Sequence, residues 1–164
     1  MGSSRFSVRF QIAGLIEFEI CSLKWNWVKT FSRKISRSIS KNQIIFFEGE
    51  AGSGKTTLIR YILSEISKSE KKTFSFQGSP TYQREHIYNF NKFNIIHFDF
   101  YQVQNNKLDL DEYFNDNCVL IEWPLENLIK RYNHMALSIN ISVTGEKRNI
   151  EIKSSNKKWL HKIK

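Results

Sequence analysis

Short apolar runs alternate with amphipathic stretches along the chain. Residues 43–48, 94–100 and 118–122 are rich in Ile, Val, Leu and Phe and are bounded by polar residues, which is typical of buried strands. The apolar residues of 58–66 recur at helical spacing and predict a helix. The same spacing over 25–35, after Ser22 as a potential cap, predicts an earlier helix. The chain therefore interleaves strands with helices.

The remaining segments give weaker patterns. Residues 136–143 and 149–152 flank Gly145 and predict a hairpin, while the alternation over 16–20 predicts an exposed edge strand. Two short helices are also predicted, over 109–114 and 125–132. Together these elements predict an α/β fold with a central, mostly parallel sheet and antiparallel strands at its edges.

Between the first buried strand and its helix, residues 49–57 read Gly-Glu-Ala-Gly-Ser-Gly-Lys-Thr-Thr. Four positions satisfy the G-x-x-x-x-G-K-[ST] pattern of a phosphate-binding loop. Glycines let the backbone curl so that successive N–H groups point at one anion, next to the positive end of the following helix. A simple glycine turn is the alternative, and the order strand, loop, helix argues against it. The sequence therefore predicts a nucleoside-triphosphate site in a three-layer P-loop NTPase fold.

The loop supplies most of the expected nucleotide contacts. Lys55 is expected to reach the β- and γ-phosphates, and the Thr56 hydroxyl is expected to bind Mg²⁺. The residues predicted to bind the nucleotide through this loop are Gly49, Ala51, Gly52, Ser53, Gly54, Lys55, Thr56 and Thr57.

Two carboxylates end apolar runs: Asp99 and Glu122. Ligands bind at the carboxyl ends of strands in open α/β sheets, so both side chains are expected beside the phosphates if their strands neighbour the loop-bearing strand. An unpaired charge there would be costly. A role in holding Mg²⁺ or water is the favoured interpretation, and a salt bridge is the alternative.

Composition narrows the class of protein. A chain of 164 residues with 40% hydrophobic and 14% aromatic residues suits one globular domain, and no apolar run is long enough to cross a bilayer. Cys21 and Cys118 are isolated, and the four His residues show no zinc spacing. These features predict a cytoplasmic protein without a membrane partner.

The net charge of +9 is concentrated at the ends of the chain. Residues 1–42 carry eight Lys and Arg against two acids, residues 153–164 carry five Lys and no acid, and the body between them has a net charge of −2. The basic ends could contact RNA or an acidic protein, or they could be solvated tails. The expected division is an N-terminal extension over 1–15, an ATPase domain over 16–152 and a basic tail over 153–164.

Four segments together resemble the TsaE family, also called the YjeE ATPases. The phosphate-binding loop is the first, and Ser79-Pro-Thr-Tyr82 with the later Tyr88 is similar to the family's switch segment. His97-Phe-Asp-Phe-Tyr101 is similar to its H-x-D-x-Y motif, and Ile121-Glu-Trp-Pro124 to its I-E-W-P motif. The resemblance covers about residues 16 to 152. Gln102 stands where the family has Arg, which removes a charge that could bridge to an acid or to a partner.

The resemblance implies a set of roles. Thr81 orders the attacking water or the metal, Asp99 acts in hydrolysis, and Glu122 binds Mg²⁺ together with Thr56. Lys55, Asp99 and Thr81 are thus the predicted catalytic residues. His97 and Tyr101 are expected to support Asp99, Arg148 to lie near the nucleotide, and the region from Ser22 to contact the adenine. For Trp123, core packing and a place in the site remain open.

The resemblance also implies a function. The chain is expected to be a P-loop ATP hydrolase, slow alone and stimulated by partners, with ATP and Mg²⁺ as cofactors. Its partners would be TsaD and TsaB, which install threonylcarbamoyl on adenosine 37 of tRNAs. Contact with tRNA would be indirect or through the basic ends, and DNA is not an expected partner. Two alternatives remain: a P-loop small-molecule kinase and a nucleotide-gated, non-catalytic scaffold.

Overall fold

A computed structural model describes residues 5–11, 15–21, 26–81, 85–103, 109–145 and 147–163, with side chains from Val28 onward except those of Lys147 and Lys158. Eight strands form one sheet in the order β1-β2-β8-β7-β3-β6-β5-β4. The strands are β1 (Arg5–Gln11), β2 (Leu15–Cys21), β3 (Gln43–Glu48), β4 (Glu85–Asn89), β5 (Asn94–Asp99), β6 (Asn117–Glu122), β7 (Leu137–Thr144) and β8 (Lys147–Ser154). The helices are α1 (Asn26–Ser38), α2 (Lys55–Ser69), α3 (Glu126–Tyr132) and α4 (Lys157–Ile163), with a 3₁₀ turn, η1 (Asp111–Tyr113).

The centre of the sheet is parallel and its flanks are antiparallel. Strand β3 pairs in parallel with β6 and with β7, and β6 pairs in parallel with β5. The pairs β4–β5, β7–β8, β8–β2 and β2–β1 are antiparallel. This arrangement confirms the predicted fold class. It also brings the carboxyl ends of β3, β6 and β5 to one edge, where Phe47 is opposite Glu122 and Glu122 is opposite Asp99.

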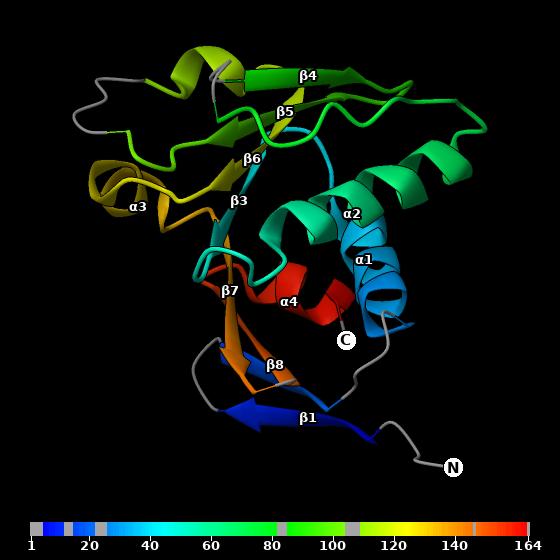
Figure 1. The fold of residues 1–164 in the computed structure, drawn as a ribbon. Helices are drawn as coiled ribbons and strands as arrows, with labels where there is room; N and C mark the ends of the chain where they lie inside the picture. Colours follow the sequence, from blue (N-terminus) through cyan, green and yellow to red (C-terminus); the bar gives the residue numbers. More distant parts are fainter. Residues whose placement is uncertain are drawn as a thin grey trace.

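Helices cover both faces of this sheet, giving three layers (Figure 1). Successive residues of β3 point to opposite faces because side chains alternate along a strand. Ile45 and Phe47 pack in a core cluster with α1, α2 and α4, whereas Ile44 and Phe46 pack in a second cluster with α3. All four side chains are fully buried. The glycine loop therefore starts from a strand that is held on both sides.

Most predicted elements are present; one strand was placed wrongly, one strand was missed and one helix is shorter than predicted. The alternating segment 16–20 lies inside β2, which pairs with both β1 and β8, so the predicted exposed edge strand is wrong. Strand β4 was not predicted: its His and Asn residues and a run of only five positions give a weak pattern, and its pairing with β5 holds it in the sheet. The short helix expected at 109–114 is reduced to η1.

The folded unit extends past both expected boundaries. Residues 5–11 form β1, which pairs with β2 over seven positions, although 1–15 was expected to be an extension. At the other end, the expected basic tail forms α4, and its Trp159, Leu160 and Ile163 are buried in the core. Burial of a Leu or Ile side chain contributes about 1.5–3 kcal/mol relative to exposure. The apolar residues of the basic tail thus outweigh its charges in deciding its structure.

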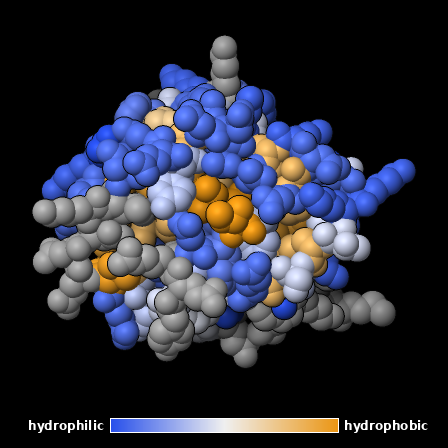
Figure 2. Space-filling view, turned by 90° about the horizontal axis from the view of Figure 1, so that it is seen from above, coloured by the Kyte–Doolittle hydropathy of each residue, from blue (hydrophilic) through white to orange (hydrophobic). Residues whose placement is uncertain are grey.

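The surface is mainly hydrophilic where Figure 2 shows it, with apolar residues scattered rather than joined in a band. Among the described residues the exposed large hydrophobic side chains are those of Ile87, Tyr101 and Val143. In the same part of the chain, no helix is long and apolar enough to cross a membrane.

Candidate nucleotide-binding site

The loop between β3 and α2 requires glycine at its turning points. Gly49, Gly52 and Gly54 have φ values of 132°, 77° and 112°, which side chains rarely adopt. A Cβ atom on Gly49 would also lie 2.2 Å from the carbonyl oxygen of Ile141 on β7. Gly54 is the N-cap of α2, and its carbonyl accepts from the N–H of Leu58 at 2.9 Å. The free N–H groups of the first turn of α2 thus border the loop.

Lys55, the first residue of α2, crosses the mouth of the loop. Its Nζ donates to the carbonyl oxygens of Gly49 (2.7 Å) and Glu50 (2.9 Å). The residue is only 4% exposed, and burial lowers the pKa of its amine, an effect that Glu122 and Asp99 partly oppose. The amine is therefore held at the loop by backbone oxygens and lies in the field of both carboxylates.

Glu122 is bonded to regular elements on both of its oxygens. Thr56 Oγ1, from α2, donates to Oε2 at 2.7 Å, and Nε2 of His97, from β5, lies 2.9 Å from Oε1. His97 is fully buried and Glu122 is 2% exposed. The expectation that His97 supports Asp99 is therefore wrong. Because side chains alternate along β5, residues 97 and 99 share a face, but the neighbouring strand presents Glu122 to His97.

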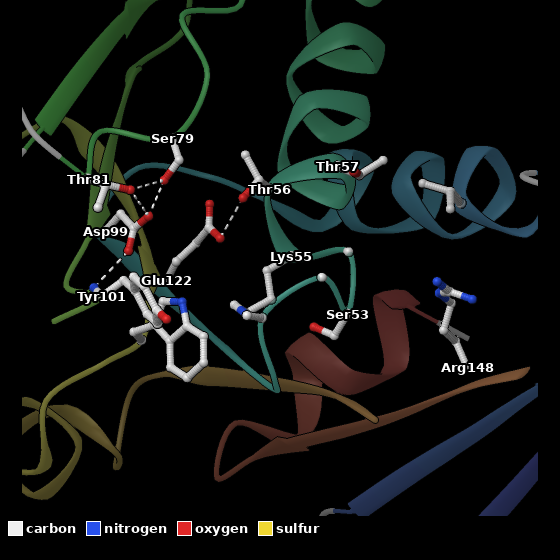
Figure 3. A pocket seen from close by; sticks show the side chains of 15 residues that line it. Ser53, Lys55, Thr56, Thr57, Ser79, Thr81, Asp99, Tyr101, Glu122 and Arg148 are labelled. Carbon is white, nitrogen blue, oxygen red and sulfur yellow. Dashed lines mark hydrogen bonds between the residues drawn. The ribbon is translucent and has the colours of Figure 1, made fainter. Parts of the chain in front are cut away.

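Asp99 is bonded to a loop instead. Thr81 Oγ1 donates to Oδ2 at 2.7 Å, and the Ser79 hydroxyl donates to the same oxygen. The two hydroxyl oxygens are 3.1 Å apart. The backbone N–H of Tyr101 donates to Oδ1 at 2.8 Å, so Tyr101 does support Asp99, through its main chain. The loop that contains Pro80 is thereby fastened to the end of β5 (Figure 3).

Trp123 belongs to the site. It follows β6 with a φ of 55°, and its N–H donates to the carbonyl oxygen of Phe47 at 3.2 Å. The centroids of the Trp123 and Tyr101 rings are 5.0 Å apart, and Lys55 Nζ lies 4.0 Å from the centroid of the Trp123 ring. Such a contact between an amine and an indole is favourable by about 0.5–2 kcal/mol. The sequence did not distinguish between core packing and a place in the site for Trp123. In the structure the left-handed backbone at Trp123 turns the indole ring towards Lys55.

A cavity of about 330 Å³ joins these groups. All the predicted site residues line it except Gly49, which lies behind the loop and bonds Lys55 through its carbonyl. Figure 3 places Thr56, Thr81, Asp99 and Glu122 on one side of Lys55 and Arg148 on the other. Arg148 comes from β8 and shares the cavity but not the carboxylate cluster.

Four lining residues were not among the predicted site residues: Val28, Ser79, Tyr101 and Trp123. Three of these are members of the quoted motifs, so the signal was available in the sequence. Val28 lies in the region that was expected to contact the adenine, but it was not itself predicted as a site residue. Ser22, the start of the region expected near the adenine, and Tyr82 of the switch segment lie outside the described residues.

The groups present are suitable for a magnesium nucleotide. Thr56 and Glu122 offer hydroxyl and carboxylate oxygens, which are the ligand types that Mg²⁺ takes, and the loop offers backbone N–H groups to phosphates. Ser53 Oγ is buried against the cavity without a hydrogen-bond partner among the described residues. No group of three or more His, Cys, Asp or Glu side chains arranged for a metal occurs in that part of the chain. Substrate phosphates commonly complete a site of this kind.

A glycine loop between a central parallel strand and its helix, with acidic residues at the ends of the next two strands, defines a P-loop NTPase fold. Comparison with known proteins is more specific. The profile of the family described as "Threonylcarbamoyl adenosine biosynthesis protein TsaE" matches residues 24–151. The chain belongs to the TsaE family, as its motifs predicted.

Curated relatives carry the same name. The Haemophilus influenzae "tRNA threonylcarbamoyladenosine biosynthesis protein TsaE" is 32% identical over 114 residues, which cover 66% of this chain and 68% of that protein. The Rickettsia typhi protein of the same name is 28% identical over 134 residues, or 78% and 89% of the two chains. The Rickettsia prowazekii protein is 31% identical over 99 residues, or 58% and 66%.

A solved structure supports the fold. The structure titled "Crystal structure of Bacillus subtilus YdiB" superposes with a TM-score of 0.67 and covers 95% of this chain and 93% of that chain. Its sequence identity is 19%, so the likeness is one of fold.

Proposed function

We propose that the protein is a Mg²⁺-dependent ATPase that acts in the synthesis of threonylcarbamoyladenosine at position 37 of tRNAs. The observation that carries the proposal is the meeting of Lys55, the Thr56–Glu122 pair and the Asp99 carboxylate around one cavity at the start of α2. Membership in a family named for this biosynthesis supports the pathway, and the names of the curated relatives extend it to tRNA.

The chain's own groups would divide the work. The loop N–H groups and Lys55 would bind the β- and γ-phosphates and offset the charge that builds up during transfer. Thr56 and Glu122 would hold Mg²⁺, which supplies additional positive charge to the phosphates when bound. Asp99, with the Thr81 hydroxyl beside it, would orient the water that attacks the γ-phosphate and accept its proton.

We also propose that hydrolysis is slow until a partner binds. Among the described residues Arg148 is the arginine that lines the cavity, and it lies across Lys55 from Asp99 (Figure 3). None of the other arginines in the described part of the chain lines it, which supports a stabilising cation supplied by a partner, a mode known for P-loop proteins. The expected partners are proteins of the TsaD and TsaB type, in the cytoplasm.

The test is nucleotide binding followed by hydrolysis. Binding of a fluorescent ATP analogue is measured with and without MgCl₂, and phosphate release is then measured alone and with TsaD, TsaB and tRNA. Lys55→Ala serves as the inactive control. Magnesium-dependent binding with partner-stimulated release is the expected result. Rapid, partner-independent release or transfer of phosphate to a small acceptor would contradict the proposal, as would binding without turnover in the full mixture.

A further inference from the structure

Two basic segments that the fold brings together account for the net positive charge of the chain. Residues 26–41 and 153–163 contain nine Lys and Arg and no Asp or Glu, so their combined charge equals the +9 of the whole chain. In the structure α1 and α4 pack against each other, and Trp159 Nε1 of α4 donates to Ser38 Oγ of α1 at 3.0 Å. Segments that are more than 100 residues apart thus form neighbouring parts of one layer (Figure 1).

Both helices bury their apolar residues and expose their basic ones. On α1, Lys29, Arg33 and Arg37 are exposed at intervals of four residues, a rise of about 6 Å each. On α4, Lys157 and Lys162 are exposed while Trp159, Leu160 and Ile163 are buried. We call the set Lys29, Arg33, Arg37, Lys157 and Lys162 the α1–α4 basic face.

Four of these five cations are available for a partner. Arg33 is bound to Glu65 of α2 at 3.0 Å. Lys29, Arg37, Lys157 and Lys162 form no ion pair within the described part of the chain. Exposed cations without carboxylate partners repel one another, and a polyanion would remove that repulsion.

The chemistry of this face favours nucleic acid over the other anionic partners. Neither α1 nor α4 carries any of the exposed large hydrophobic side chains found among the described residues. Insertion into a membrane surface and docking of a protein both use exposed apolar or aromatic anchors. Binding of a phosphodiester backbone relies on Lys and Arg and needs no such anchor.

We propose that the α1–α4 basic face binds the phosphate backbone of RNA. None of the five residues of the face lines the cavity, although Val28, which precedes Lys29 on α1, does. The proposal therefore goes beyond the ATPase function and does not depend on nucleotide binding. It would give a tRNA-modification protein a direct contact with its RNA.

The test uses the full chain and a fluorescent, unmodified tRNA transcript without ATP, with anisotropy measured between about 50 and about 200 mM KCl. Arg37→Gln with Lys162→Gln removes one cation from each helix. The magnitude of the slope of log K against log[salt] should fall by about 1.5, and the affinity at intermediate salt by about tenfold.

The matched control is Lys130→Gln with Arg131→Gln, which removes the same charge from exposed positions of α3 on the opposite face of the sheet. It should leave most of the affinity in place. The proposal is overturned if wild-type protein fails to bind the transcript at low salt, or if both double variants lose affinity equally. Displacement of the transcript by polyglutamate as efficiently as by unlabelled tRNA would also overturn it and would favour an acidic protein. Failure of ATP hydrolysis would leave this measurement unaffected.

Discussion

Asp99 and Glu122 are opposite each other at the ends of adjacent parallel strands, yet their surroundings differ. Glu122 accepts hydrogen bonds from a helix residue, Thr56, and from a strand residue, His97. Asp99 accepts from Ser79 and Thr81, which lie in the connection between α2 and β4. One carboxylate is held by regular elements within the core, and the other holds a loop.

This difference assigns different tasks to two similar groups. A carboxylate fixed by a helix and a strand keeps its position, which suits a metal ligand whose geometry must be ready. A carboxylate that binds loop hydroxyls can exchange them for water or phosphate when the loop moves, and such loops commonly respond to the γ-phosphate. We therefore expect substitutions at the two positions to impair different steps.

The largest effect is expected from Asp99→Asn. The amide keeps the size of the side chain but loses the basic oxygen, so turnover should fall by about 100- to 10,000-fold. Binding of the magnesium nucleotide should change by less than about threefold, since Glu122 and Thr56 remain. Single-turnover phosphate release and equilibrium binding separate the two quantities. Loss of binding together with turnover would contradict the distinction between the two carboxylates.

Glu122→Gln should act on the metal instead. Removing the charge of a ligand that is 2% exposed should raise the Mg²⁺ concentration needed for half-maximal nucleotide binding by about 100-fold, because hard cations require anionic oxygen. Nucleotide binding without Mg²⁺ should be equal to wild type or slightly tighter. Isothermal calorimetry with and without EDTA measures both quantities, and an unchanged Mg²⁺ requirement would remove Glu122 from the proposed metal site.

His97 tests the difference between the two carboxylates, because it bonds to Glu122 and not to Asp99. His97→Leu removes the 2.9 Å contact to Oε1, and the Mg²⁺ requirement should rise about tenfold. His97→Gln, whose amide can donate, should recover part of the loss. Thermal denaturation of both variants identifies a purely structural effect: equal destabilisation with an unchanged Mg²⁺ requirement would show that His97 packs the core and does not position Glu122.

The sequence was most informative where local chemistry leaves few solutions. The loop needs glycine at positive φ and a lysine at the start of the helix, so the pattern of residues 49–57 is sufficient to predict it. The strands that end at Asp99 and Glu122 are continuous apolar runs and could be predicted as well. Which side chains of the site hydrogen-bond to each other could not be predicted, because this depends on the order of the strands in the sheet. The β5–β6 register sets Asp99 opposite Glu122, and only the side-chain contact of the folded protein shows that His97 reaches diagonally to Glu122.

The structure of the two ends of the chain could not be predicted for another reason. Residues 153–164 contain five Lys, and their composition predicts a basic tail outside the ATPase domain. Three apolar residues at helical spacing are enough to attach α4 once α1 and β8 offer a surface. In the same way, β1 joins the sheet only through its one partner, β2, which itself pairs with β8. Both outcomes depend on tertiary contacts that a local pattern does not contain.

The smallest expected effect concerns His86, which links the two carboxylate environments. It is opposite His97 in the β4–β5 pair and hydrogen-bonds to the backbone of Gly78, next to Ser79. Burial lowers its pKa below the ordinary value of 6.5; the bond to Gly78 opposes this shift, and His97 adds to it. The unfolded chain then binds a proton more readily than the folded one, so the free energy of unfolding should decrease as the pH falls through 6.5 towards the lower folded pKa.

His86→Gln should therefore flatten the dependence of unfolding free energy on pH between about 7 and about 5.5, whatever it does to stability at neutral pH. The matched control for the loss of a histidine is His134→Gln at an exposed position. Urea denaturation at several pH values measures the slopes. If His86→Gln shows the same dependence of unfolding free energy on pH as the wild type, His86 is not the buried, neutral link between the Asp99 loop and the strand that supports Glu122.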